Sequence, residues 1–138
     1  MIVVERISPD GTPHRILIGV HELPVDMSLA DGGEGPDPHD YYDSALGACK
    51  ALTMVWYARR NGIPLEGVHV GIVRDNSEER QGIYRLTARI AIDGPMTDEQ
   101  RASLIEVAHK CPIHKLMTQV ETRIETIMVE PSSIRADD

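Results

Sequence analysis

The chain has 138 residues, of which 41% are hydrophobic and only 4% are aromatic, with no phenylalanine. Lysine and arginine number 14 against 22 aspartates and glutamates, so the net charge is −8. This composition is typical of a single globular domain over residues 1–138. The acidic balance, without any basic cluster, argues against nucleic acid as a partner.

The N-terminal residues favour a cytoplasmic protein. An alternating, strand-like segment follows Met1, where a signal peptide would have a charged and then an apolar region. No apolar run approaches the roughly 20 residues of a membrane span, so no membrane partner is expected. Structural disulfides are rare in a reducing compartment. Cys49 and Cys111 are therefore inert, metal-binding or redox-active.

The start of the chain predicts a β-hairpin followed by a loop. Residues 2–7 and 16–21 have strand patterns on either side of a turn at residues 9–12, and residues 22–37 have loop composition. The glycines near the end of this loop lack the spacing of a phosphate or dinucleotide motif, so no cofactor is expected. An isolated hairpin is marginally stable. We therefore expect the hairpin to pair with another element, such as a second copy of the chain.

Residues 38–60 predict a long helix. Asp37 is a good N-cap, Pro38 suits the first helical position, and Asn61-Gly62 is a stop signal. Apolar residues occur on nearly every face of this helix, and they include Ala45, Ala48, Cys49, Leu52, Val55 and Trp56. A helix that is apolar all round is usually buried. We therefore expect a central core helix that packs against a second helix.

The rest of the chain predicts strands and helices that do not alternate regularly. The expected elements are strands over 68–73 and 84–92, a helix from a Thr97–Gln100 capping box to about 110, a helix over 112–119, a strand over 121–129 and a polar tail over 131–138. This order indicates the α+β class, with antiparallel sheets.

The two cysteines can each be explained in two ways. Cys49 lies within the apolar helix, where a free cysteine is usually an inert small hydrophobe. Cys111 precedes Pro112 at a helix start, where the helix dipole favours a thiolate. Either residue is a core residue or a redox thiol, and the pattern alone leaves both open.

Histidines lie near both cysteines in the sequence. His109, Cys111 and His114 have a metal-like spacing, but no second cluster completes four zinc ligands, so no metal is expected. His39 lies ten residues before Cys49, or roughly 15 Å along one helix, so the two cannot touch within that helix.

Two segments resemble the cysteine motifs of the OsmC/Ohr family. The stretch from Gly35 through His39 to Cys49 resembles the first motif, and Lys110-Cys111-Pro112-Ile113-His114 resembles the second. The order of elements and the separation of the cysteines match as well, so the resemblance covers essentially the whole chain.

The resemblance implies a fold and an activity. It implies an intertwined homodimer with antiparallel sheets around two central helices, in which the hairpin of residues 1–21 joins the partner's sheet. It also implies hydroperoxide reduction, with Cys49 as the peroxidatic thiolate, Cys111 as the resolving thiol and a reductant such as dihydrolipoamide. Thiolate, sulfenic acid and disulfide interconvert reversibly.

The chain departs from the family at one position. Peroxidase members have a glutamate ten residues before the first cysteine and an N-terminal arginine that pairs with it, whereas this chain has His39 there and offers Arg6 and Arg15 as candidates. We therefore assign Cys49, Cys111 and His39 as the catalytic residues of a thiol peroxidase. The alternative is a non-catalytic OsmC-like module that binds a small hydrophobic ligand or a protein partner.

Overall fold

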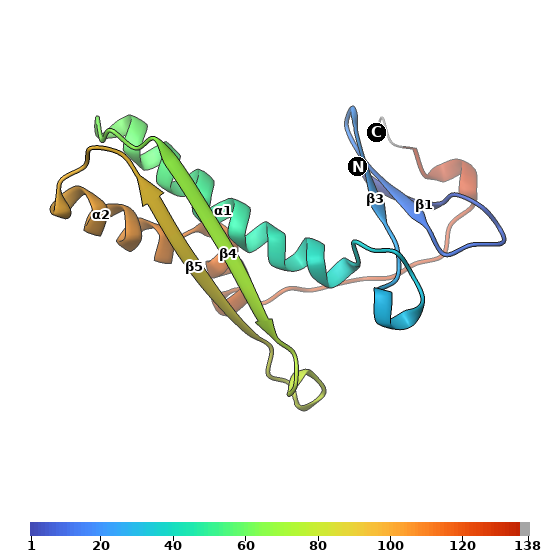
Figure 1. Cartoon of the computed structure of the whole chain (residues 1–138). Helices are drawn as coiled ribbons and strands as arrows, with labels where there is room; N and C mark the ends of the chain where they lie inside the picture. Colours follow the sequence, from blue (N-terminus) through green and yellow to red (C-terminus); the bar gives the residue numbers. More distant parts are fainter. Residues whose placement is uncertain (136–138) are drawn as a thin grey trace. The chain divides into compact units, whose positions relative to one another are not determined.

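A computed structural model describes residues 1–135 and divides the chain into two compact units (Figure 1). The first unit contains residues 1–41 and the described residues from Arg123 onward, and the second contains Tyr42–Thr122. Antiparallel sheets and three α-helices confirm the predicted α+β class. The last three residues of the predicted polar tail lie outside the described residues.

The first unit contains a three-stranded antiparallel meander of β1 (Ile2–Arg6), β2 (His14–Ile18) and β3 (His21–Val25). The predicted hairpin is therefore only partly right: its second strand begins at His14 and ends at Ile18, and residues 21–25 form a strand where a loop was expected. Gly19 has a φ of +57° and reverses the chain after Ile18. The apolar run Ile16-Leu17-Ile18 is followed by Val20 directly after this glycine, so the sequence pattern gave no sign of the turn.

The second unit is built from one hairpin and three helices. The strands of the hairpin are β4 (Gly67–Asp75) and β5 (Arg85–Asp93). The helices are α1 (Pro38–Arg60), α2 (Asp98–His109) and α3 (Pro112–Gln119), and the first turn of α1 belongs to the first unit. The strands pair antiparallel from Gly67 opposite Asp93 to Asp75 opposite Arg85. The predicted helices and these two strands are confirmed within a few residues.

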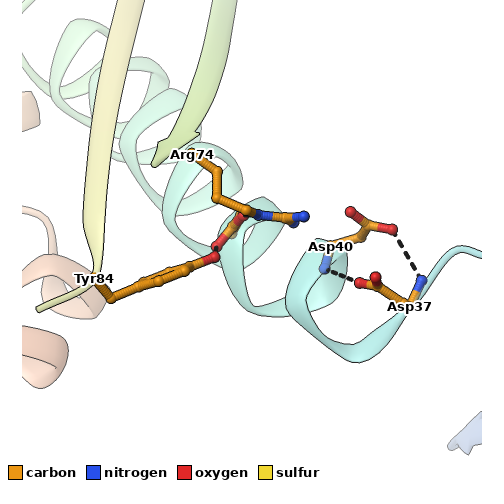
Figure 2. A network of polar contacts seen from close by, with 5 residues as sticks. Asp37, Asp40, Arg74 and Tyr84 are labelled. Carbon is orange, nitrogen blue, oxygen red and sulfur yellow. Dashed lines mark hydrogen bonds and ion pairs between the residues drawn. The ribbon is translucent and has the colours of Figure 1, made fainter. Parts of the chain in front are cut away.

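The helix caps explain where the helices begin. The side chain of Asp37 accepts a hydrogen bond from the Asp40 backbone N–H at 2.9 Å, and the Asp40 carboxylate accepts one from the Asp37 N–H at 2.9 Å (Figure 2). At α2 the expected capping box is present, with reciprocal bonds between Thr97 and Gln100. Each cap satisfies backbone donors that a helix start leaves without a partner.

The core of the second unit lies where α1 and α2 meet the β4–β5 hairpin. Its buried residues are Met54, Ala58, Leu104 and Ala108. Gly47 marks a close approach on this face of α1, because a Cβ there would lie 3.1 Å from the Ile72 side chain of β4. The helix therefore lies close against the strand, which fixes the positions of its neighbours, including Cys49 and Lys50.

The prediction that α1 is buried all round is wrong for the single chain. Its buried residues follow one face, and they are Asp43, Leu46, Gly47, Lys50, Met54 and Ala58. On another face Leu52 is 67% exposed and Trp56 is 57% exposed, with the Arg60 guanidinium 5.0 Å from the Trp56 ring centroid. One hairpin and one helix cover only part of a helix surface, so apolar residues elsewhere stay exposed.

The predicted strand at residues 121–129 is not formed. This segment has no regular secondary structure in the described chain, and Ile124 and Met128 are 84% and 98% exposed. A strand needs a neighbouring strand to accept and donate its ladder hydrogen bonds. Within residues 1–135 no strand pairs with this segment, so its apolar alternation has no sheet to join.

Candidate active site

Cys49 lies in the middle of α1, where it is partly buried. Its Sγ atom is 4.0 Å from Oγ1 of Thr53, one helical turn further on. The helix that carries it is fixed by the core contacts of Met54 and Ala58. Cys49 is therefore held on a rigid element, and the residue keeps some exposure to solvent.

Cys111 is the N-cap of α3, as the Cys-Pro sequence predicted. Its backbone is extended, with φ −63° and ψ 146°, and its sulfur accepts a hydrogen bond from the His114 N–H at 3.4 Å. Pro112 occupies the first helical position, where a missing N–H costs nothing. The side chain is fully buried.

The two cysteines lie together as free thiols. Burial raises the pKa of Cys111 above its usual value, and a hydrogen bond with the Cys49 side chain raises it further. The His114 N–H and the positive charge of Lys50 act in the opposite direction on this pKa. The structure thus brings together two of the three predicted site residues, from the middle of α1 and the start of α3.

Lys50 is a residue that the sequence reasoning missed. It is only 4% exposed, and its Nζ atom donates to the Ala108 carbonyl at 2.9 Å and lies 3.0 Å from Nδ1 of His114. Burial lowers the pKa of His114, and the Lys50 charge lowers it further. A neutral His114 can accept a hydrogen bond at Nδ1 from the ammonium group. A lysine directly after a cysteine inside an apolar helix was the signal that could have revealed this cluster.

A second polar cluster lies on α1, six residues before Cys49. The guanidinium of Arg74 and the hydroxyl of Tyr84 both donate to the buried Asp43 carboxylate, Tyr84 at 2.7 Å (Figure 2). Burial and, next, the Asp43 carboxylate together raise the pKa of Tyr84 to about 12. These contacts connect the hairpin of β4 and β5 to α1.

The other predicted candidates belong to the first unit. His39 lies in the first turn of α1, and Arg6 and Arg15 lie on β1 and β2. Arg15 is paired with Glu5 and Glu22, whereas the Arg6 Nε donates to the Gly11 carbonyl at 2.9 Å. The roles suggested for these three residues stay predictions.

An apolar cavity lies beside Lys50 and His114. It has a volume of about 300 Å³, and its walls come mainly from β5 and α2, with Leu86, Ala88, Ile90, Ile105 and Ala108 among them. Within residues 1–135, no three histidine, cysteine or acidic side chains gather in a way that could hold a metal ion. The donors around the cysteine pair are thus thiols, an ammonium group and an imidazole.

The family of the chain follows from comparison with known proteins. A family model described as OsmC-like protein matches residues 31–126, well over half of the chain and both cysteines. The chain belongs to the OsmC-like family. No curated protein matches it.

Solved structures of OsmC-like proteins share the fold. The OsmC like protein from Mycoplasma pneumoniae has a TM-score of 0.70 at 17% identity, over 87% of this chain and 87% of that chain. An organic hydroperoxide resistance protein OsmC from Legionella pneumophila has a TM-score of 0.58 at 19% identity, over 86% and 90%. The organic hydroperoxide resistance protein OhrB of Bacillus subtilis has a TM-score of 0.54 at 18% identity, over 86% and 91%. At these identities the likeness establishes the OsmC-like fold. In the described part of this OsmC-like chain, no helix is long and apolar enough to cross a membrane.

Proposed function

We propose that this protein reduces organic or small hydroperoxides through its two thiols, as a defence against oxidative stress. The observation that carries the proposal is the contact between Cys49 and Cys111, because a resolving thiol must reach the sulfenic acid that it condenses with. Structural neighbours named organic hydroperoxide resistance proteins support the substrate class. The apolar cavity beside Lys50 would suit a substrate with an alkyl or aryl group.

The chemistry needs two steps at the cysteine pair. The Cys49 thiolate attacks the outer peroxide oxygen, the O–O bond breaks, and the departing alkoxide takes up a proton to give an alcohol. Cys49 is then a sulfenic acid. Cys111 attacks the Cys49 sulfur, and the hydroxyl group leaves as water after protonation. The resulting disulfide is reduced by a dithiol such as dihydrolipoamide, which itself becomes oxidised.

The partly exposed Cys49 is assigned to the first step and the buried Cys111 to the second. A hydroperoxide has to approach the first thiol from solvent, whereas the resolving thiol meets only its neighbour. We assign His39 a tuning role, on the basis of its place in the Asp37-Pro38-His39 stretch of the first motif. A His39→Ala variant should then change the pH dependence of the first step.

We also propose that the protein acts as an intertwined homodimer. The exposed Leu52 and Trp56 on α1 support this, because adjacent apolar residues of this size are usually covered in the working protein. The exposed Ile124 and Met128 support it too, since a partner subunit would cover these apolar side chains. In this arrangement the strands within residues 1–21 are exchanged between subunits.

Hydroperoxide turnover in purified variants tests the proposal. With cumene hydroperoxide and dihydrolipoamide, the native protein should consume peroxide catalytically and Cys49→Ser should not. Cys111→Ser is the matched control: it should complete one turnover and keep a sulfenic acid that dimedone traps. Peroxide consumption by Cys49→Ser at the native rate would overturn the assignment of Cys49.

A further inference from the structure

Lys50 is a buried cation without an acidic partner. It is 4% exposed, and within residues 1–135 none of its contacts is with a carboxylate. A buried charge is costly unless another charge or several hydrogen bonds compensate it. The Ala108 carbonyl, in the last turn of α2, and a neutral imidazole supply two acceptors. One of the three ammonium N–H groups has no partner among these contacts.

We propose that Lys50 is the positioning residue that stabilises Cys111 as a departing thiolate when the Cys49–Cys111 disulfide is reopened. Lys50 lies next to Cys49 in the chain, and it is bonded to Ala108 and His114 on either side of Cys111. The bond to His114 joins it to the turn that also holds the Cys111 sulfur. The inference rests on the proposed thiol chemistry, and it specifies which cysteine the reductant attacks and which one leaves when the disulfide is reduced.

The cysteine that the reductant attacks follows from the burial of the two residues. Cys111 is fully buried and Cys49 only partly, so an external thiolate attacks Cys49. The S–S bond then breaks, and Cys111 leaves with the electron pair as a thiolate. The reductant remains on Cys49 as a mixed disulfide. Its second thiol attacks the reductant sulfur of that bond, which releases Cys49 as a thiolate and the oxidised reductant, and protons from the dithiol return to the two cysteines.

The titratable groups of the described residues that act on Cys111 come from α1, and they are Lys50 and the thiol of Cys49. His114 of α3 bonds the Cys111 sulfur through its backbone N–H, and His109 of α2 acts on the His114 imidazole. The charge of Lys50 lowers the pKa of Cys111 against the effect of burial. Burial lowers the pKa of His114, which favours its neutral form, so Lys50 is the cation that acts on Cys111. A leaving thiol with a lower pKa departs faster.

The rate at which the disulfide opens tests this role. The reduced protein is oxidised with diamide, which takes up the two thiol hydrogens, and dithiothreitol then reopens the disulfide over a range of pH. Lys50→Met should slow the opening by about tenfold at neutral pH and move the profile to higher pH. Lys50→Arg should restore most of the rate, and Lys115→Met, which removes an exposed lysine of α3, should leave it unchanged. Opening of the Lys50→Met disulfide at the native rate and pH profile would overturn the proposal.

A second measurement uses only the native protein, in case Lys50→Met does not fold. Glutathione is added to the diamide-oxidised protein, the reaction is stopped with acid, and the position of the adduct is mapped by mass spectrometry. We expect glutathione on Cys49 and a free thiol on Cys111. An adduct on Cys111, or no disulfide with diamide, contradicts the inference. Both tests form the disulfide with diamide and not with a hydroperoxide, so their results do not depend on peroxidase activity. Failure of the Lys50 proposal and failure of the proposed function can therefore be told apart.

Discussion

The Nζ atom of Lys50 lies 3.0 Å from Nδ1 of His114, and this contact joins the middle of α1 to the first turn of α3. The same turn contains the N–H that bonds the Cys111 sulfur. Lys50 and His114 therefore fix the distance between the two helices that carry the cysteines. The contact requires a neutral imidazole at Nδ1, which makes the cluster sensitive to pH.

Acidification should destabilise the fold through His114. Burial lowers the pKa of His114 below its usual value of 6.5, and so the unfolded chain binds this proton more readily than the folded chain. The stability that neutral His114 provides is complete above about pH 6.5 and is lost as the pH falls through the lower, folded pKa. Urea unfolding from neutral to mildly acidic pH should show this loss, and it should be smaller in His114→Gln. His69→Gln, which changes an exposed histidine, should keep the native pH dependence; an equal change in both variants would contradict the role of His114.

Tyr84 should titrate at high pH. Burial and the bond to the Asp43 carboxylate together raise the pKa of Tyr84 to about 12. Ultraviolet pH titration should therefore show a late component that is absent in Tyr84→Phe. In Asp43→Asn this component should move to lower pH and should stay above the usual value of 10.0, because burial remains. A late component that does not move would show that Asp43 has no part in it.

Leu104→Ala should be strongly destabilising. Leu104 is fully buried in the core formed with Met54, Ala58 and Ala108. Removing a buried leucine side chain to the β-carbon typically costs about 2–5 kcal/mol, including the cavity left behind. Denaturant unfolding should show a decrease in this range. Leu29→Ala, at a position that is 80% exposed, should change the free energy of unfolding by less than about 0.5 kcal/mol.

Leu52→Glu should weaken self-association without unfolding the chain. Leu52 is 67% exposed within one subunit, so a charge there costs little in the isolated fold. In a homodimer that covers this face, the same charge would be buried. Sedimentation equilibrium should give twice the chain mass for the native protein and a shift toward the single-chain mass for Leu52→Glu.

Val73→Glu is the control for the association experiment. Val73 is 52% exposed and is adjacent in β4 to Ile72, whose side chain lies beside Gly47 of α1. Neighbouring strand residues point to opposite faces, so Val73 faces away from α1. This variant should keep the native mass. A native protein that sediments as a single chain at micromolar concentration would contradict the dimer.

Local signals predicted most of the second unit. The Thr97–Gln100 box, the Cys111-Pro112 start and the stop at Gly62 are short-range features, and each was found where the sequence indicated. The failures depended on neighbours distant in the chain. Residues 121–129 have a strand pattern, but they join no sheet within the described chain. Helix α1 has apolar residues on faces that the rest of its unit leaves exposed.

The candidate site could also be predicted only in part, because it too depends on residues that are distant in the chain. Motif spacing identified the two cysteines, and their contact is a matter of tertiary packing that the resemblance implied. Lys50 was overlooked because a single lysine in a helix usually faces solvent. Its partners, Ala108 and His114, lie 58 and 64 residues further along the chain. Only the folded arrangement brings these groups together.

The disulfide formed on exposure to a hydroperoxide tests the central claim most directly. Fully reduced protein is mixed with one equivalent of cumene hydroperoxide, remaining thiols are alkylated, and the peptides are mapped by mass spectrometry. We predict one cross-linked peptide pair containing Cys49 and Cys111, which Cys49→Ser should not form. Two alkylated thiols that survive an excess of hydroperoxide would contradict the account.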